Sequence, residues 1–112
     1  SVVSRLQKPV TLAFDSDSLE TAVEMLSEAT RVIIEIAGND LELQGITKNQ
    51  SFSLSERGRS GADILLTILQ KSEGKPGQLV YVFRKDGEHD KVVITTKISA
   101  QQRGEQLPEV FQ

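Results

Sequence analysis

The sequence predicts an α+β domain whose elements follow the order strand, helix, strand, strand, helix, strand, strand. Short stretches with apolar residues at every second position recur along the chain, which is typical of half-buried strands. Two longer stretches carry apolar residues three and four positions apart, which is typical of helices. A chain of 112 residues is long enough for one hydrophobic core, so we expect a single domain.

The first strand and the first helix follow one another directly. PVTLAF, residues 9–14, alternates larger apolar side chains with small or polar ones, as a strand packed on one face does. Asp17 or Ser18 can then cap a helix, with Glu20 or Thr21 placed three residues further on. The apolar side chains of this helix form one stripe, widened by Met25: Leu19, Ala22, Val23, Leu26 and Ala29.

Two further strands are expected before the second helix. RVIIEI, residues 31–36, is rich in β-branched residues and ends at the turn signal GND. SFSL, residues 51–54, alternates again, whereas LEL, residues 41–43, is too short to assign. We expect a loop over SERGRSG, residues 55–61.

The second helix, ADILLTILQKS at residues 62–72, is apolar over more than half of its circumference. Such a helix is expected to be covered from two sides. One apolar face carries four residues and another carries two: Ile64, Leu65, Ile68 and Leu69, and then Ala62 and Leu66.

Two alternating runs within residues 78–96 predict a closing hairpin around a charged turn that contains Asp86 and Gly87. Leu79, Tyr81 and Phe83 share one face of it. The two halves of the chain, each strand-helix-strand, therefore look like one unit used twice.

The last segment, residues 97–112, is polar until its apolar residues Leu107, Val110 and Phe111. Composition alone is typical of a linker. We predict a C-terminal tail or linker beside a domain of residues 1–96, packed on that domain or on a neighbour. The three apolar residues are candidates for a docking tail that occupies a sheet edge or groove.

Composition excludes several classes of function. With 13 basic and 16 acidic residues the net charge is -3, so the chain lacks the basic excess that binds phosphate backbones, which disfavours nucleic acid as a partner. The absence of cysteine excludes a disulfide framework and thiolate metal sites, but leaves the cellular compartment open. No apolar run approaches the roughly 18 residues of a membrane span, and SVVSRLQKPV lacks the layout of a signal peptide. Because the chain begins at Ser1, we expect a segment of a longer protein.

Three stretches resemble the short N-terminal domain shared by secretins and TonB-dependent transducers, the secretin/TonB short N-terminal (STN-like) domain. They are VTLAFDSDSLETAVEMLSEATRVIIEI, FSLSERGRSGADILLTILQKS and the strand pair that ends VVITT, which together span about residues 9–96. The matching helix positions are Leu19, Ala22, Leu26, Ala29 and Thr30 in the first helix and Ile64, Leu65, Ile68 and Leu69 in the second.

The resemblance implies a fold in which two helices are sandwiched between a two-stranded and a three-stranded sheet. It also implies a non-catalytic module of a larger exported or envelope protein, acting in secretion or transport. Such a module docks other proteins or copies of itself, and the implied location is the periplasm or the cell envelope.

Candidate catalytic residues are sparse. His89 is the only histidine, and its neighbours in DGEHD point in different directions along a turn or strand, so we expect no metal site there. A Ser-His-Asp or Cys-His arrangement would have to be built around this one imidazole. Ser51, Ser53 and Ser55 alternate with apolar residues and fit the wet face of a strand. We therefore expect no enzyme and no cofactor.

RGRSG offers the alternative function, a small anion- or nucleic-acid-binding domain. Glycines let the backbone approach a ligand, arginines bring positive charge, and the segment leads into a helix whose first amides can hold an anion. The candidate residues are Arg57, Gly58, Arg59, Ser60 and Gly61. The competing interpretation is a glycine-containing loop that ends in an ordinary Ser60 cap.

Overall fold

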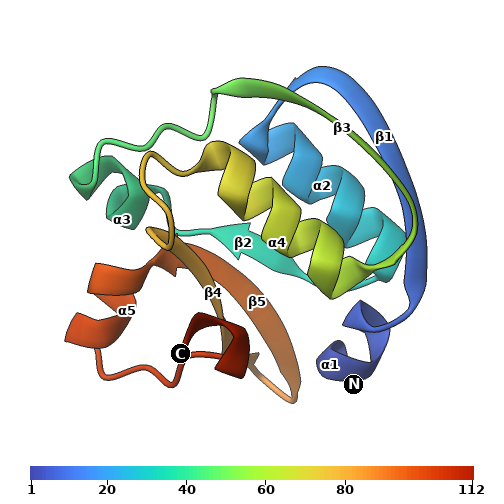
Figure 1. Cartoon of the computed structure of the whole chain (residues 1–112). Coiled ribbons are helices and arrows are strands. Elements are labelled where there is room, and N and C mark those ends of the chain that lie inside the picture. The colour runs from blue at the N-terminus through green and yellow to red at the C-terminus, as the bar shows by residue number, and fades with distance from the viewer.

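Two helices lie side by side between two sheets. The computed structural model describes residues 1–112 and has α2 (Leu19–Thr30) and α4 (Gly61–Ser72) in its middle layer, with the smaller sheet above and the larger sheet below in Figure 1. The predicted α+β fold with two sandwiched helices is therefore confirmed. None of the helices combines the length and the apolar character needed to cross a bilayer.

The strands of the two halves interleave. The two-stranded sheet joins β1 (Pro9–Ser18) to β3 (Ser51–Ser60) in antiparallel orientation. In the three-stranded sheet, β5 (His89–Thr96) lies between β2 (Ile34–Ile36), to which it is parallel, and β4 (Leu79–Asp86), to which it is antiparallel. The edges of the larger sheet are therefore β2 and β4.

Serine side chains start both central helices. The Ser18 hydroxyl oxygen accepts a hydrogen bond from the amide of Thr21 at 3.2 Å, and the Ser60 hydroxyl accepts one from the amide of Asp63 at 3.1 Å. Each cap satisfies an amide that has no partner inside the helix. Of the two caps predicted for the first helix, the structure selects Ser18.

The buried stripe of α2 differs from the prediction at its last turn. Leu19, Ala22, Val23 and Leu26 are buried as expected, but Ala29 is exposed and Thr30 is buried in its place. The start of α4 approaches α2 on the side of Thr30, where Gly61 has no side chain to obstruct it. In α4 the predicted residues Ile64, Leu65, Ile68 and Leu69 are all buried.

Three short helices were not predicted: α1 (Val2–Leu6), α3 (Gly38–Leu43) and α5 (Lys97–Gln102). Each is too short for an apolar period to repeat. The stretch LEL, left unassigned from the sequence, forms the end of α3. The strand expected over residues 31–36 begins only at Ile34.

The loop predicted at residues 55–61 is wrong up to Ser60, because β3 continues through it. Arg59 pairs with Val10 and Ser60 with Pro9 across the antiparallel ladder. Pairing with a strand that lies far away in the sequence gives this glycine-containing segment its hydrogen bonds. The sequence of residues 55–61 by itself does not indicate that this segment pairs with β1.

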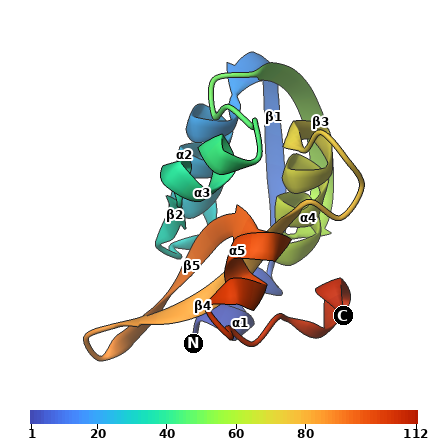
Figure 2. The ribbon, with the colours of Figure 1, turned by 90° about the vertical axis from the view of Figure 1, so that its left-hand side faces the viewer.

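The C-terminal tail packs on its own domain. Val80, Val82, Val93 and Ala100 form a small cluster on the sheet face turned away from the central helices, and Leu107 and Phe111 pack against it. The tail ends in the 3₁₀ turn η1 (Glu109–Phe111), and Figure 2 shows α5 and this tail beside β4 and β5. The aromatic rings of Phe111 and Tyr81 meet edge to face with centroids 5.1 Å apart.

Candidate functional site

The edge of β2 is open along its backbone. The Ile33 carbonyl accepts a hydrogen bond from β5 and the Ala37 amide donates one to β5, each at 2.8 Å. In a parallel ladder alternate residues face the partner, so Ile33, Glu35 and Ala37 face β5 while the peptide groups of Ile34 and Ile36 point outward. Because β2 is the last strand of its sheet, these outward groups have no strand beside them.

A groove of about 340 Å³, here called the edge groove, runs between β2 and α2. Its apolar lining comes from Val23 and from Ile34 and Ile36, which are half-buried. Its charged lining residues are Glu20, Glu24, Glu35 and Lys48. The edge groove is therefore apolar along its base and predominantly acidic along its walls.

Two ion pairs involve glutamates of the edge groove: one is about half exposed, and in the other only the glutamate is, because the Lys91 side chain is 21% exposed. The Lys48 ammonium lies 3.2 Å from a Glu20 carboxylate oxygen, and the Lys91 ammonium lies 3.0 Å from one of Glu35. Surface pairs of this kind contribute about 0–1 kcal/mol, so an incoming charged group can replace either partner at small cost. Glu24 is exposed and forms no ion pair within the chain.

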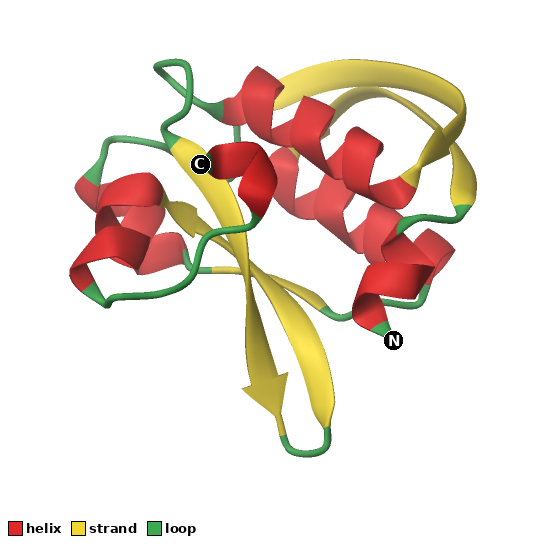
Figure 3. Ribbon diagram, turned by 60° about the horizontal axis from the view of Figure 1, so that its bottom comes forward, coloured by secondary structure: helices red, strands yellow, loops and turns green.

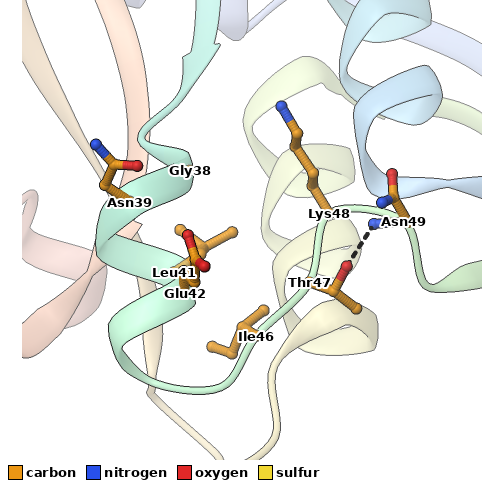
Figure 4. A pocket seen from close by; sticks show the side chains of 8 residues that line it. All are labelled: Gly38, Asn39, Leu41, Glu42, Ile46, Thr47, Lys48 and Asn49. Atoms are coloured by element: carbon orange, nitrogen blue, oxygen red, sulfur yellow. Dashed lines mark hydrogen bonds between the residues drawn. The ribbon is translucent and has the colours of Figure 1, made fainter.

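A second hollow, of about 430 Å³, continues from the edge groove at Lys48, which lines both. Figure 4 shows it between α3 and the segment that leads to β3, with Leu41, Glu42 and Ile46 turned into the space between them. The Asn49 amide donates to the Thr47 hydroxyl at 3.2 Å, which fixes the turn on one side of the hollow.

The opposite edge of the larger sheet, on β4, is partly closed. A Glu73 carboxylate oxygen accepts from the outward amide of Leu79 at 3.0 Å, and Phe111 covers the next outward residue, Tyr81. Phe83 is 37% exposed further along the strand, where the hairpin projects from the body of the molecule (Figure 3). Of the proposed docking-tail residues, Leu107 and Phe111 are half-buried on the domain itself and only Val110 is exposed.

The RGRSG residues serve the fold at most positions. The Arg59 guanidinium lies 3.0 Å from a Glu56 carboxylate oxygen and donates to the Thr67 hydroxyl at 3.2 Å. The Ser60 side chain is the cap of α4. Gly58 has a positive φ of 66°, a conformation that favours glycine.

Gly61 and Arg57 differ in role. A Cβ atom at Gly61 would lie 2.7 Å from the Thr30 methyl carbon and 3.3 Å from the Leu6 carbonyl oxygen, so glycine is needed for close packing. Arg57 alone is exposed without a hydrogen bond or ion pair in the chain. The structure therefore does not bring the five residues together around one open space, and anion binding by this segment stays a prediction.

Sequence reasoning missed a charged cluster under the tail. Asp40, which is 6% exposed, accepts hydrogen bonds from the Thr95 hydroxyl at 2.7 Å and from the Arg103 guanidinium at 2.6 Å. Glu105 accepts two hydrogen bonds of 2.9 Å from the guanidinium of Arg84. Asp40 lies in the GND stretch read as a turn, and nothing in the local sequence indicates these distant partners.

Hydrogen bonds from arginine lower the pKa values of the two acids in this cluster. The Arg103 guanidinium holds the pKa of Asp40 below its usual value, and that of Arg84 does the same for the pKa of Glu105. No group of three or more histidine, cysteine, aspartate or glutamate side chains is placed so that it could hold a metal ion.

Comparison with protein-family models, with curated proteins and with solved structures found no match to this chain.

Proposed function

We propose that the domain is a non-catalytic docking module, and that the open edge of β2 receives an extended segment of a partner protein. The observation that carries this proposal is the unpaired backbone of Ile34 and Ile36 within the edge groove. Main-chain hydrogen bonds to a sheet edge hold extended peptides, while pockets for alternate side chains select among them.

The charge of the edge groove indicates the chemistry of the partner. Glu20, Glu24 and Glu35 face it against the single lysine Lys48, and Glu42 lines the hollow beyond. A segment that alternates apolar residues with lysine or arginine complements this surface, since its apolar side chains reach Ile34 and Ile36 while its charges replace the exposed pairs.

The short edge limits how much the backbone alone can contribute. Ile34 and Ile36 offer two donors and two acceptors, and each hydrogen bond contributes roughly 0.5–1.5 kcal/mol. Discrimination between partners then depends on the side chains placed in the edge groove and in the hollow beside α3.

The setting of the module is part of the same proposal. The resemblance to the secretin/TonB short N-terminal domain supports the proposal that this module is part of a larger exported or envelope protein. The arrangement of two helices between a two-stranded and a three-stranded sheet agrees with the fold that the resemblance implies. An immunoblot of fractionated source cells, with an antibody raised against this domain, tests the setting. A large parent protein in the envelope fraction is expected, and a small cytoplasmic one would contradict it.

Docking is tested by NMR titration of the labelled chain with two short peptides of equal length, one alternating valine with lysine and one alternating valine with glutamate. The lysine peptide is expected to shift the amide resonances of Ile34, Ile36 and Lys48 in a saturable manner. The glutamate peptide is expected to bind at least about tenfold more weakly.

A proline substitution separates edge pairing from general attraction. Ile34→Pro removes an outward amide and leaves the bonds of β2 to β5 in place, because Ile34 does not face β5. Ile34→Val trims the same side chain and keeps the amide, so it is the matched control. Equal binding of the lysine peptide by the two variants, or equal binding of both peptides by the parent chain, would rule out this docking edge.

A further inference from the structure

A third hollow differs from the edge groove in charge: its charged lining residues are mostly basic, whereas those of the edge groove are mostly acidic. It has a volume of about 430 Å³ and is formed by α1, the residues that link α2 to β2, and the tip of the β4–β5 hairpin. Its charged or titratable lining residues are Arg5, Arg31, Lys85, Glu88, His89 and Asp90. We call it the basic cleft.

The two arginines of the basic cleft have no acidic partner. Lys85 and Asp90 pair with one another at 3.0 Å, which leaves Glu88 as the only other acid in the lining. Neither Arg5 nor Arg31 forms an ion pair with it or with any other carboxylate. In a chain of net charge -3, this is a local excess of positive charge that no intramolecular contact neutralises.

Arg5 is held in place rather than free in solvent. Its guanidinium donates a hydrogen bond of 2.9 Å to the carbonyl oxygen of Arg31. That contact uses one of its five N–H donors and leaves the remaining ones for a ligand. The bond therefore holds the Arg5 guanidinium beside the backbone of Arg31, and both residues line the basic cleft.

Arg31 stands in a conformation that suits glycine better than arginine. Its φ of 58° and ψ of 35° lie in the left-handed region, where residues with a Cβ atom are strained. Its backbone role, which is to end α2, needs no side chain. A strained arginine with an unpartnered side chain, facing a hollow, is an observation that favours a functional role over a structural one.

The floor of the basic cleft is apolar. Val2 and Val32 are buried beneath it, and Ile33, which is 50% exposed, extends it towards β2. An apolar floor under guanidinium groups strengthens their attraction for a charged ligand, because the surroundings screen it less than water does.

We propose that the basic cleft binds a phosphate group, either as inorganic phosphate or as the head of a phosphomonoester. Guanidinium groups match the oxygens of a phosphate through parallel N–H donors, and two of them match a doubly charged anion. His89 lines the same hollow and supplies a further ring N–H. The site is separate from the edge groove and does not depend on docking at β2.

The test is an NMR titration of the full chain at fixed pH and constant ionic strength. Inorganic phosphate, glycerol 3-phosphate and acetate are added in separate experiments, and the side-chain N–H signals of Arg5 and Arg31 are followed. Saturable shifts are expected with the two phosphates and not with acetate. Tighter binding of the ester than of inorganic phosphate would identify a phosphomonoester as the ligand, and the reverse would identify free phosphate.

Arg31→Gly is the decisive variant, because glycine relieves the strained conformation and loss of binding then cannot be blamed on misfolding. It and Arg5→Lys are each expected to weaken phosphate binding at least about tenfold, the loss typical of one charge-assisted contact. Lys71→Ala combined with Lys75→Ala removes two exposed positive charges elsewhere and is expected to leave binding unchanged.

Three results would overturn the proposal. One is the absence of any saturable shift with either phosphate. Another is an equal response to acetate, which would indicate general charge attraction. The third is unchanged phosphate binding in Arg31→Gly.

Discussion

Asp40 and Arg103, 63 residues apart in the sequence, are joined by a hydrogen bond of 2.6 Å that ties α3 to the end of α5. The carboxylate is nearly buried and also accepts from Thr95 of the central strand β5. Arg103 lies 3.6 Å from Glu105, which binds Arg84 of β4. One charged cluster thus joins two short helices and the tail to the larger sheet.

Asp40→Asn is expected to lower the free energy of unfolding by about 2 kcal/mol, because hydrogen bonds to an ionised group contribute roughly 1.5–3 kcal/mol each. The amide cannot accept as strongly from both Thr95 and Arg103. Urea unfolding of the two proteins measures the difference. Asp86→Asn, at the exposed hairpin turn, is the control and should stay within about 0.5 kcal/mol of the parent.

The same cluster predicts a dependence of stability on pH. Asp40 and Glu105 have folded-state pKa values below the ordinary values of 3.8 and 4.5, so the unfolded chain binds more protons than the folded chain in the interval between. Their contribution is therefore complete above the unfolded pKa values and is lost as the pH falls through the lower, folded ones. The urea concentration at the unfolding midpoint should therefore fall steeply as the pH is lowered from about 5 to about 2.

The variant Asp40→Asn combined with Glu105→Gln removes both titrating groups. Its urea midpoint is expected to depend less on pH over the same interval than that of the parent chain. Identical slopes for the two proteins would show that other carboxylates dominate acid unfolding.

The strained end of α2 predicts a stabilising substitution. Arg31→Gly is expected to raise the free energy of unfolding by about 0.5–1 kcal/mol, since relief of a left-handed residue is partly offset by the greater freedom of glycine in the unfolded chain. Arg31→Ala keeps the strain and removes the same side chain, so it is the matched control. If the alanine variant gained as much stability as the glycine variant, the strain would not be the cause.

How far the fold could be predicted depends on the distance over which each feature is determined. The two helices, their stripes and the cap at Ser18 follow from residues close together in the sequence, and the structure has them with small differences at the ends. The continuation of β3 through Gly58 depends on pairing with β1, where Gly58 donates to Thr11, 47 residues earlier in the chain, and no local pattern contains that information. The three short helices could not be predicted for a different reason: each is too short for an apolar repeat to show.

The candidate site was harder to predict than the fold. Which strand has a free edge is a property of sheet order, and the order β2-β5-β4 appears only when the parallel and antiparallel pairings are assembled. Arg5, Arg31 and His89 come from three separate segments that meet only in the folded chain. The residues of RGRSG are adjacent in sequence and so form a visible motif, yet Ser60 and Gly61 are explained by a helix cap and a close packing contact.

Removing the aromatic side chain of the tail is expected to lower the stability of the domain moderately. Phe111→Ala removes the ring that packs edge to face on Tyr81 and covers the edge of β4, and it is expected to cost about 1–3 kcal/mol because the ring is only half-buried. Val110→Ala, one residue earlier and 56% exposed, is the matched control and should change little.

A chain that ends at Arg103 should melt at a lower temperature than the parent. An unchanged melting temperature and oligomeric state would show that the tail has no role in packing or docking.

The contact between Gly61 and Thr30 permits a test by rescue. Gly61→Ala is expected to destabilise the chain by about 1–3 kcal/mol, because the new Cβ atom would lie 2.7 Å from the Thr30 methyl carbon and either helix must shift to accommodate it. Thr30→Ser removes that methyl group and keeps the hydroxyl that donates to the Leu26 carbonyl at 2.8 Å. The double variant should therefore recover much of the loss, measured as a coupling free energy in a double-mutant cycle. Strict additivity of the two substitutions would mean that the cost arises elsewhere, at the Leu6 carbonyl oxygen 3.3 Å from the same position, and that the two central helices are not in limiting contact there.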